Sequence, residues 1–259
     1  ERDRKYLEFS DGTRSYFPLR IPKTIKFKID ETDPADQYAR FFAEEVVEAV
    51  NSLTLPRYGL GNYQQSSPRT PPTPDEAKIL ADLSRAGSRL KGFCRTNLFK
   101  RLESSGHALS LSIERHVLRN YIVLHAIEKG LPIPIGTQDM GLLDTWSNDQ
   151  DTDLWTPALD NGENGPEEEI SGFSSGTFSE QVLRGKASEV YDTYSRQYRR
   201  RFKWLKPDLF TDELAEDLLN DSGILMGILG GSGNWDSNRD TKLQALLTLL
   251  EEEHPCEKV

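Results

Sequence analysis

The spacing of apolar residues between positions 105 and 129 constrains the fold more than any other feature of this chain. Within that stretch, apolar side chains recur every three or four residues, which is the spacing of one helical face. These positions are Leu109, Ile113, Val117, Tyr121 and Leu124. Gly130 and the prolines that follow it are typical of a helix C-terminus. The stretch therefore predicts one long amphipathic helix.

The same spacing predicts further helices over residues 33–53, 75–104, 178–205, 211–229 and 240–253. Asp33 and Pro34 suit a helix start as cap and first helical residue, and Asp240 is a second expected cap. Gly87 and Gly92 are possible breaks within the 75–104 helix. Residues 23–29 alternate polar and apolar side chains and predict a short strand. The expected fold class is mainly α, a helical insertion domain with a short N-terminal strand segment.

Composition shifts along the chain suggest five parts. Residues 1–32 would be a strand-containing lead-in, and 33–133 a first helical unit containing a Pro-rich linker at 64–74. Residues 134–176 are acidic and rich in loop-forming residues. Residues 177–253 would form a second helical unit, and 254–259 the start of another strand.

The formal net charge of −10 is distributed unevenly. No Lys, Arg or His occurs between Lys129 and Arg184, whereas that stretch holds eleven acids. The remaining chain has 31 acids against 32 bases. Local potential, and not net charge, decides whether a polyanion can dock, so the overall acidity does not exclude one.

No complete catalytic motif is present. The glycines of residues 230–233 are followed by Asn234 and Trp235, without the lysine of a phosphate-binding P-loop, so a plain turn is expected there. His107, His116 and His125 are spaced nine residues apart, which points neighbours in nearly opposite directions on a helix and excludes a shared metal site. We expect no catalytic, cofactor-binding or metal-binding residue.

Two stretches combine bases with aromatic residues, a pattern that suits contact with nucleic-acid phosphates. The alternative for each stretch is that its aromatic residues belong to the core and its bases form a solvated helix face. One extends from residue 95 to 119 and the other from 194 to 206. The candidate DNA-binding residues are Arg95, Lys100, Arg101, Arg115, Arg119, Arg196, Arg199, Arg200, Arg201 and Lys203.

Three segments together resemble a known family. Residues 19–30, from Leu-Arg-Ile-Pro-Lys to Phe-Lys-Ile-Asp, followed by the helix containing Tyr38, resemble the segment just past the first motor lobe of Swi/Snf-type (superfamily two) helicase-like ATPases. Residues 95–105, Arg-Thr-Asn-Leu-Phe-Lys-Arg-Leu-Glu-Ser-Ser, resemble the helical region of bacterial members. Residues 240–250 resemble the helix entering the second RecA-like lobe.

The resemblance implies an inter-lobe helical region of an ATP-dependent DNA helicase or translocase. ATP and Mg would be bound by the two RecA-like lobes of the parent protein, before Glu1 and after Val259, and the helices would grip or guide duplex DNA. The alternatives are a free-standing helical protein–protein interaction module and an unrecognised metal-independent enzyme. No apolar run approaches the roughly 20 residues that span a bilayer, so no membrane partner is expected. The two cysteines, Cys94 and Cys256, favour a reducing, cytoplasmic setting.

Overall fold

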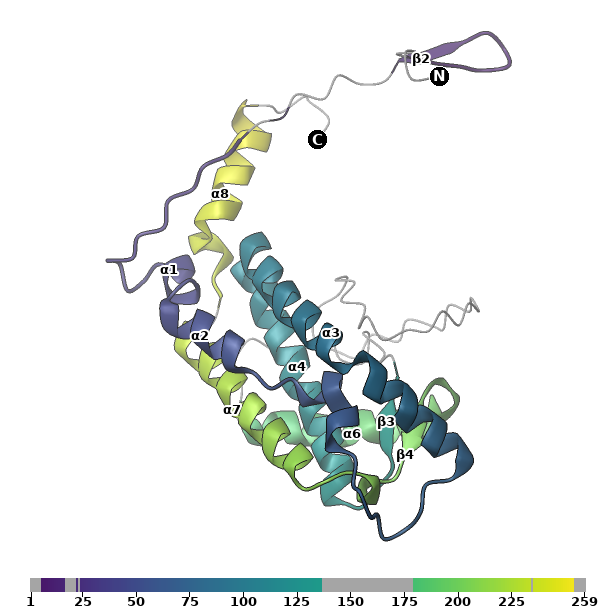
Figure 1. The fold of residues 1–259 in the computed structure, drawn as a ribbon. Helices are drawn as coiled ribbons and strands as arrows, with labels where there is room; N and C mark the ends of the chain where they lie inside the picture. Colours follow the sequence, from purple (N-terminus) through teal and green to yellow (C-terminus); the bar gives the residue numbers. More distant parts are fainter. Residues whose placement is uncertain (1–5, 17–21, 23, 137–178, 234, 254–259) are drawn as a thin grey trace. The chain divides into compact units, whose positions relative to one another are not determined.

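The computed structural model describes residues 6–16, 22, 24–136, 179–233 and 235–253, and within them the chain is mainly helical, which confirms the predicted fold class (Figure 1). The chain divides into two units. One comprises residues 29–240, and the other comprises residues 1–28 together with residues 241–259. None of the helices in the described residues is long and apolar enough to cross a membrane.

The 29–240 unit is built around α4 (Gly106–Glu128), which packs against α3 (Pro74–Ser104), α6 (Glu180–Arg196) and α7 (Glu213–Ser232). Figure 1 shows α3, α4 and α7 running side by side. Because neighbours cover α4 on several sides, most of its residues are buried, including both faces of the helix. Helices from the two expected helical units thus pack together in one body.

Helix α3 begins with a capping box. Thr73 accepts the backbone N–H of Glu76, and the Glu76 carboxylate accepts the backbone N–H of Thr73 at 2.8 Å. The helix then continues through Gly87 and Gly92 without the predicted break. The helix packs against α4 and against the 3₁₀ segment η1 (Pro56–Tyr63), and this packing offsets the low helix propensity of its glycines.

Helix α4 follows the sequence prediction closely. Ser105 caps its N-terminus, and Lys129 is its C-terminal cap. Gly130 has a φ of +63°, its N–H bonds to Ile127, and the N–H of Leu131 bonds to Ala126 at 2.8 Å. These two bonds form a Schellman motif, which needs a left-handed residue at the Gly130 position.

The single helix predicted over 33–53 is instead two helices, α1 (Gln37–Phe41) and α2 (Glu44–Ser52). Phe41 and Val50 are both buried, although nine residues in one helix would place them on opposite faces. The break at Phe42 and Ala43 lets both reach the core. The cap is also three residues later than predicted, because Asp36 accepts the N–H groups of Tyr38 and Ala39.

Helix α6 ends at Arg196, nine residues earlier than predicted. The chain then forms the 3₁₀ turn η2 (Arg199–Arg201), strand β4 (Lys203–Leu205) and the short turn η3 (Pro207–Leu209). Strand β4 pairs antiparallel with β3 (Ile133–Ile135), with Ile133 opposite Leu205 and Ile135 opposite Lys203. This pairing buries Phe202 and Leu205, and it supplies backbone partners that end the helix.

Helix α7 extends to Ser232, so Gly230 and Gly231 are helical and only Gly233, with a φ of +67°, begins the turn predicted over 230–233. The turn η4 (Ser237–Arg239) then leads to Asp240. In the second unit, α8 (Thr241–Thr248) and the π-helical turn η5 (Leu249–Glu253) occupy the range of the last predicted helix.

The second unit also contains a hairpin of β1 (Tyr6–Glu8) and β2 (Arg14–Tyr16) that the sequence did not predict. The predicted strand over 23–29 is wrong for the described residues 24–29, which belong to no helix or strand. Instead of pairing, Phe27 lies half-buried, with the amine of Lys242 5.8 Å from the centre of its ring. Of the predicted acidic segment over 134–176, only residues 134–136 are described, and the predicted strand start over 254–259 lies outside the described residues.

Candidate nucleic-acid interface

The five C-terminal candidates form one exposed surface between α6 and β4, which we call the arginine turn. Its members are Arg196, Arg199, Arg200, Arg201 and Lys203, and all five side chains are exposed. Tyr194 before the turn and Phe202 within it are buried, with ring centres 4.5 Å apart. Because these two rings anchor the turn in the core, the basic side chains between them point into solvent.

Aromatic rings also support the arginines directly. The indole Nε1 of Trp204 donates a 2.9 Å hydrogen bond to the backbone carbonyl of Arg199, and the Arg199 guanidinium lies 5.6 Å from the centre of that ring. The guanidinium of Arg201 lies 4.8 Å from the ring centre of Tyr198. Cation–π contacts of this kind hold a charged group over an apolar surface.

Most of the positive charge on the arginine turn is unneutralised. In the part of the chain that the structure describes, Arg199, Arg200 and Lys203 make no ion pair. Arg196 pairs with Asp192 at 3.4 Å, but both side chains are largely exposed, so this pair is weak. A surface of this kind attracts polyanions and releases counterions when it binds them.

The five candidates of the other stretch lie elsewhere and differ in exposure. Arg115 and Arg119, each 2% exposed, lie inside the helical unit, and so they are unavailable to a ligand on the surface. Their place on the polar face of α4 suggested exposure, but neighbouring helices cover that face. Arg95 is half-buried and donates to the carbonyl of Leu53. Arg101 is half-buried, and only Lys100 is exposed.

The two basic stretches do not make one surface. Lys206, three residues beyond the arginine turn, pairs with Glu76 at the start of α3, with 3.5 Å between its amine and the carboxylate. Lys100 lies 24 residues further along the same helix, a separation of about 36 Å at the rise of an α-helix. The structure thus brings the five C-terminal candidates together and separates them from the exposed lysine of the first stretch.

A buried polar chain that the sequence did not reveal crosses the helical unit. Nε of Arg57 donates to the side-chain oxygen of Asn120 at 2.9 Å, and Nη2 of Arg57 lies 3.1 Å from Nδ1 of His116. The amide of Asn120 donates to the hydroxyl of Ser222 at 3.2 Å. Only His116 carried a signal in the sequence, as a histidine of the 105–129 helix, because the other partners lie far apart along the chain.

This chain of contacts fixes the tautomer of His116. A guanidinium only donates hydrogen bonds, so Nδ1 of His116 accepts and Nε2 carries the proton. Nε2 faces the sulfur of Cys94 at 3.6 Å, and therefore it cannot take a proton from that thiol in this arrangement. His116 and Cys94 are both buried, which makes this cluster a packing feature and not a nucleophile–base pair.

The other sites considered in the sequence contain no assembled chemistry in the described residues. His107 is exposed, and His125 packs against Tyr191 with ring centres 5.3 Å apart. Over the described residues, no group of three or more His, Cys, Asp or Glu side chains is arranged to hold a metal ion. No family model, curated protein or solved structure matches this chain.

Proposed function

We propose that this chain is the helical region between the two motor lobes of an ATP-dependent DNA helicase or translocase of the Swi/Snf type, and that its arginine turn contacts duplex DNA. The observation that carries the proposal is the arginine turn itself, in which five exposed bases occur within eight residues. ATP and Mg would act in the RecA-like lobes of the parent protein, in the cytoplasm, and this region itself would not hydrolyse ATP.

The chemistry of the turn favours the phosphate backbone over the bases. The Arg199 guanidinium lies over the ring of Trp204, and the Arg201 guanidinium lies over the ring of Tyr198. The ring of Phe202 is buried. These rings are therefore poorly placed to stack on an unpaired base, whereas the guanidinium groups can each bond phosphate oxygens. Phosphate contacts fix position on the duplex without reading its sequence.

The division of the chain also supports the proposal. Residues 29–240 form one unit, while residues from both ends of the chain belong to the other. This is the topology of a domain inserted into another, which suits a helical region placed between two parts of a motor.

The test is binding of a fluorescent duplex by the 259-residue chain over a range of salt concentrations. For the variant with Arg199, Arg200 and Arg201 changed to Gln, we expect weaker binding and a plot of log affinity against log salt that is shallower by about 3 units, roughly one for each lost phosphate contact. The matched control changes Lys26, Arg69 and Lys129 to Gln, three exposed bases outside the turn. It alters net charge equally and should keep most of the salt dependence.

If both variants lost duplex affinity and salt dependence equally, the effect would come from net charge alone. That result would contradict the assignment of the arginine turn as the DNA contact. Absence of duplex binding, together with salt-insensitive capture of a protein ligand, would favour the interaction-module alternative. Hydrolysis of ATP by the purified chain would contradict its placement outside the motor lobes.

A further inference from the structure

The two ends of the 29–240 unit meet through residues 35–38 and 236–240, which we call the latch. Gln37, the first residue of α1, is buried and donates from Nε2 to the backbone carbonyl of Asp236 at 2.9 Å. Its Oε1 accepts the backbone N–H of Asp236 at 2.6 Å. One amide side chain thus exchanges two hydrogen bonds with a backbone 199 positions away, as residues of paired strands do.

Two further hydrogen bonds join the same ends. The hydroxyl of Tyr38 donates to the carboxylate of Asp240 at 3.0 Å, and the guanidinium of Arg239 donates to the backbone carbonyl of Ala35 at 2.6 Å. Tyr38 and Asp240 are both buried, so their bond is made away from water and its loss is costly. The latch therefore holds the two ends at several points.

Aromatic rings pack on the latch beside these bonds. The ring of Trp235 lies edge-on to the ring of Tyr38, with 5.1 Å between the ring centres, and its centre is 5.6 Å from that of Phe41. Trp235 also lies against Gly106, the first residue of α4. The latch is therefore continuous with the packing at the start of α4.

Helix α1 depends on the latch for its own stability. It has five residues, far fewer than an isolated helix needs in water. Its cap residue, Asp36, accepts the N–H groups of Tyr38 and Ala39 through one oxygen and the N–H of Asp30 through the other, the last at 2.8 Å. Contacts that support one another in this way form and open together.

We propose that the latch is a cooperative unit that fastens the two ends of the 29–240 unit to each other and opens as one piece while the remaining helices stay folded. It lies close in sequence to both points at which the chain passes between its two units. Opening it frees these ends to move apart. The arginine turn precedes α7 and the latch follows it, and α7 is about 30 Å long, so the turn is unaffected.

Residue-resolved amide hydrogen exchange of the 259-residue chain tests the latch. Gln37→Met keeps the approximate size of the side chain and removes both bonds to Asp236. We expect about tenfold faster exchange at the Asp236 amide. We expect a similar acceleration at Arg40, Phe42 and Asp240, whose N–H groups bond to other backbone carbonyls of the latch.

A matched control is available in the same unit. Gln64 also donates from Nε2 to a backbone carbonyl, that of Leu80, at 2.9 Å. Gln64→Met should leave exchange at the latch amides unchanged. The amide of Leu55 lies outside the latch and should keep its exchange rate in Gln37→Met. Tyr38→Phe is a milder variant that loses only the hydroxyl, and it should accelerate the same latch amides by a smaller factor.

Acceleration confined to Asp236 would reflect one lost bond and overturn the cooperative latch. Equal acceleration at Leu55 would place the latch within global unfolding and overturn it as well. Duplex affinity of Gln37→Met should change by less than about twofold, since distant sites act independently, and a large loss would contradict separate opening. A chain that binds no duplex contradicts the proposed function, whereas the exchange rates still decide the latch.

Discussion

The carboxylate of Asp221 on α7 accepts the backbone N–H of Leu55 at 2.7 Å, and it holds Leu55 in the left-handed conformation with a φ of +52°. The same carboxylate accepts the backbone N–H and the hydroxyl of Thr54, each at 2.9 Å. Asp221 is 1% exposed, and so its three hydrogen bonds are made away from water. One side chain therefore positions the start of η1 against α7.

Changing Asp221 to Ala should lower the free energy of unfolding by about 3 kcal/mol, because two backbone N–H groups lose their acceptor in the interior. The Asn variant keeps one acceptor oxygen and should lose about half as much. Urea unfolding followed by circular dichroism provides the measurement. Glu216→Ala, at an exposed position of the same helix, is the control, and an equal loss there would contradict the role of Asp221.

Gly106, the first residue of α4, lies against the indole of Trp235, and a β-carbon at this position would overlap the ring. Gly106→Ala should therefore destabilise the unit by about 1–3 kcal/mol. Gly92→Ala should instead stabilise α3 by about 0.5–1 kcal/mol, because open space surrounds that position. Thermal unfolding distinguishes the two, and a partial rescue of Gly106→Ala by Trp235→Leu would identify the ring as the cause.

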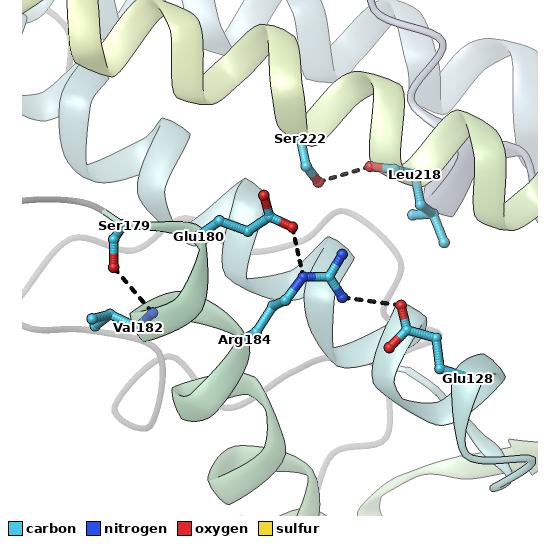
Figure 2. A network of polar contacts seen from close by, with 7 residues as sticks. All are labelled: Glu128, Ser179, Glu180, Val182, Arg184, Leu218 and Ser222. Atoms are coloured by element: carbon cyan, nitrogen blue, oxygen red, sulfur yellow. Dashed lines mark hydrogen bonds and ion pairs between the residues drawn. The ribbon is translucent and has the colours of Figure 1, made fainter.

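Two adjacent residues of α6 should differ sharply in their contribution to stability. Arg184 makes both ion pairs of Figure 2 and lies 4.9 Å from the ring centre of Tyr121, but its side chain is 33% exposed. Arg184→Met should lower the free energy of unfolding by less than about 1 kcal/mol. Leu183 is buried in the core, and Leu183→Ala should lower it by about 2–4 kcal/mol. The reverse order in urea unfolding would mean that ion pairs, and not apolar burial, dock α6.

The carboxyl group of Glu76 predicts a pH dependence of stability. Burial raises its pKa, but the bonds from Thr73 and the charge of Lys206 outweigh this effect, and the net pKa lies below the ordinary 4.5. A lowered carboxyl pKa contributes stability above the ordinary value, and this contribution is lost as the pH falls through the lowered pKa.

Glu76→Gln should therefore be less stable than the unchanged chain at about pH 7, and the two stabilities should converge as the pH falls through the lowered pKa of Glu76. Urea unfolding over a series of pH values from neutral to acidic measures the difference. Glu103→Gln, at an exposed position near the end of the same helix, is the control. A difference for Glu76 that persists unchanged at acidic pH would mean that its ionisation contributes nothing.

The local sequence was sufficient to predict a helix wherever its bounds depend on its own apolar spacing and capping residues. The bounds of α4, from its Ser105 cap to the Schellman motif at Gly130, follow from residues within a few positions of each end. The mainly helical class follows for the same reason, as does the continuity of the apolar stripe from Leu109 to Leu124. The exposure of Arg199, Arg200 and Arg201 was likewise anticipated from their charge.

Tertiary structure decided the features that depend on residues distant in the chain. Helix α6 stops at Arg196 because β4 pairs with Ile133–Ile135, about seventy residues earlier. Arg119 is buried because α4 lies between other helices, whereas its own spacing marks only one apolar face. The arginine turn lies beside Gly136 through that same strand pairing. The positions of helices follow from the spacing of apolar residues within each segment. Which polar face is covered, and which charged side chains lie close together, depends on packing between elements that this local spacing does not specify.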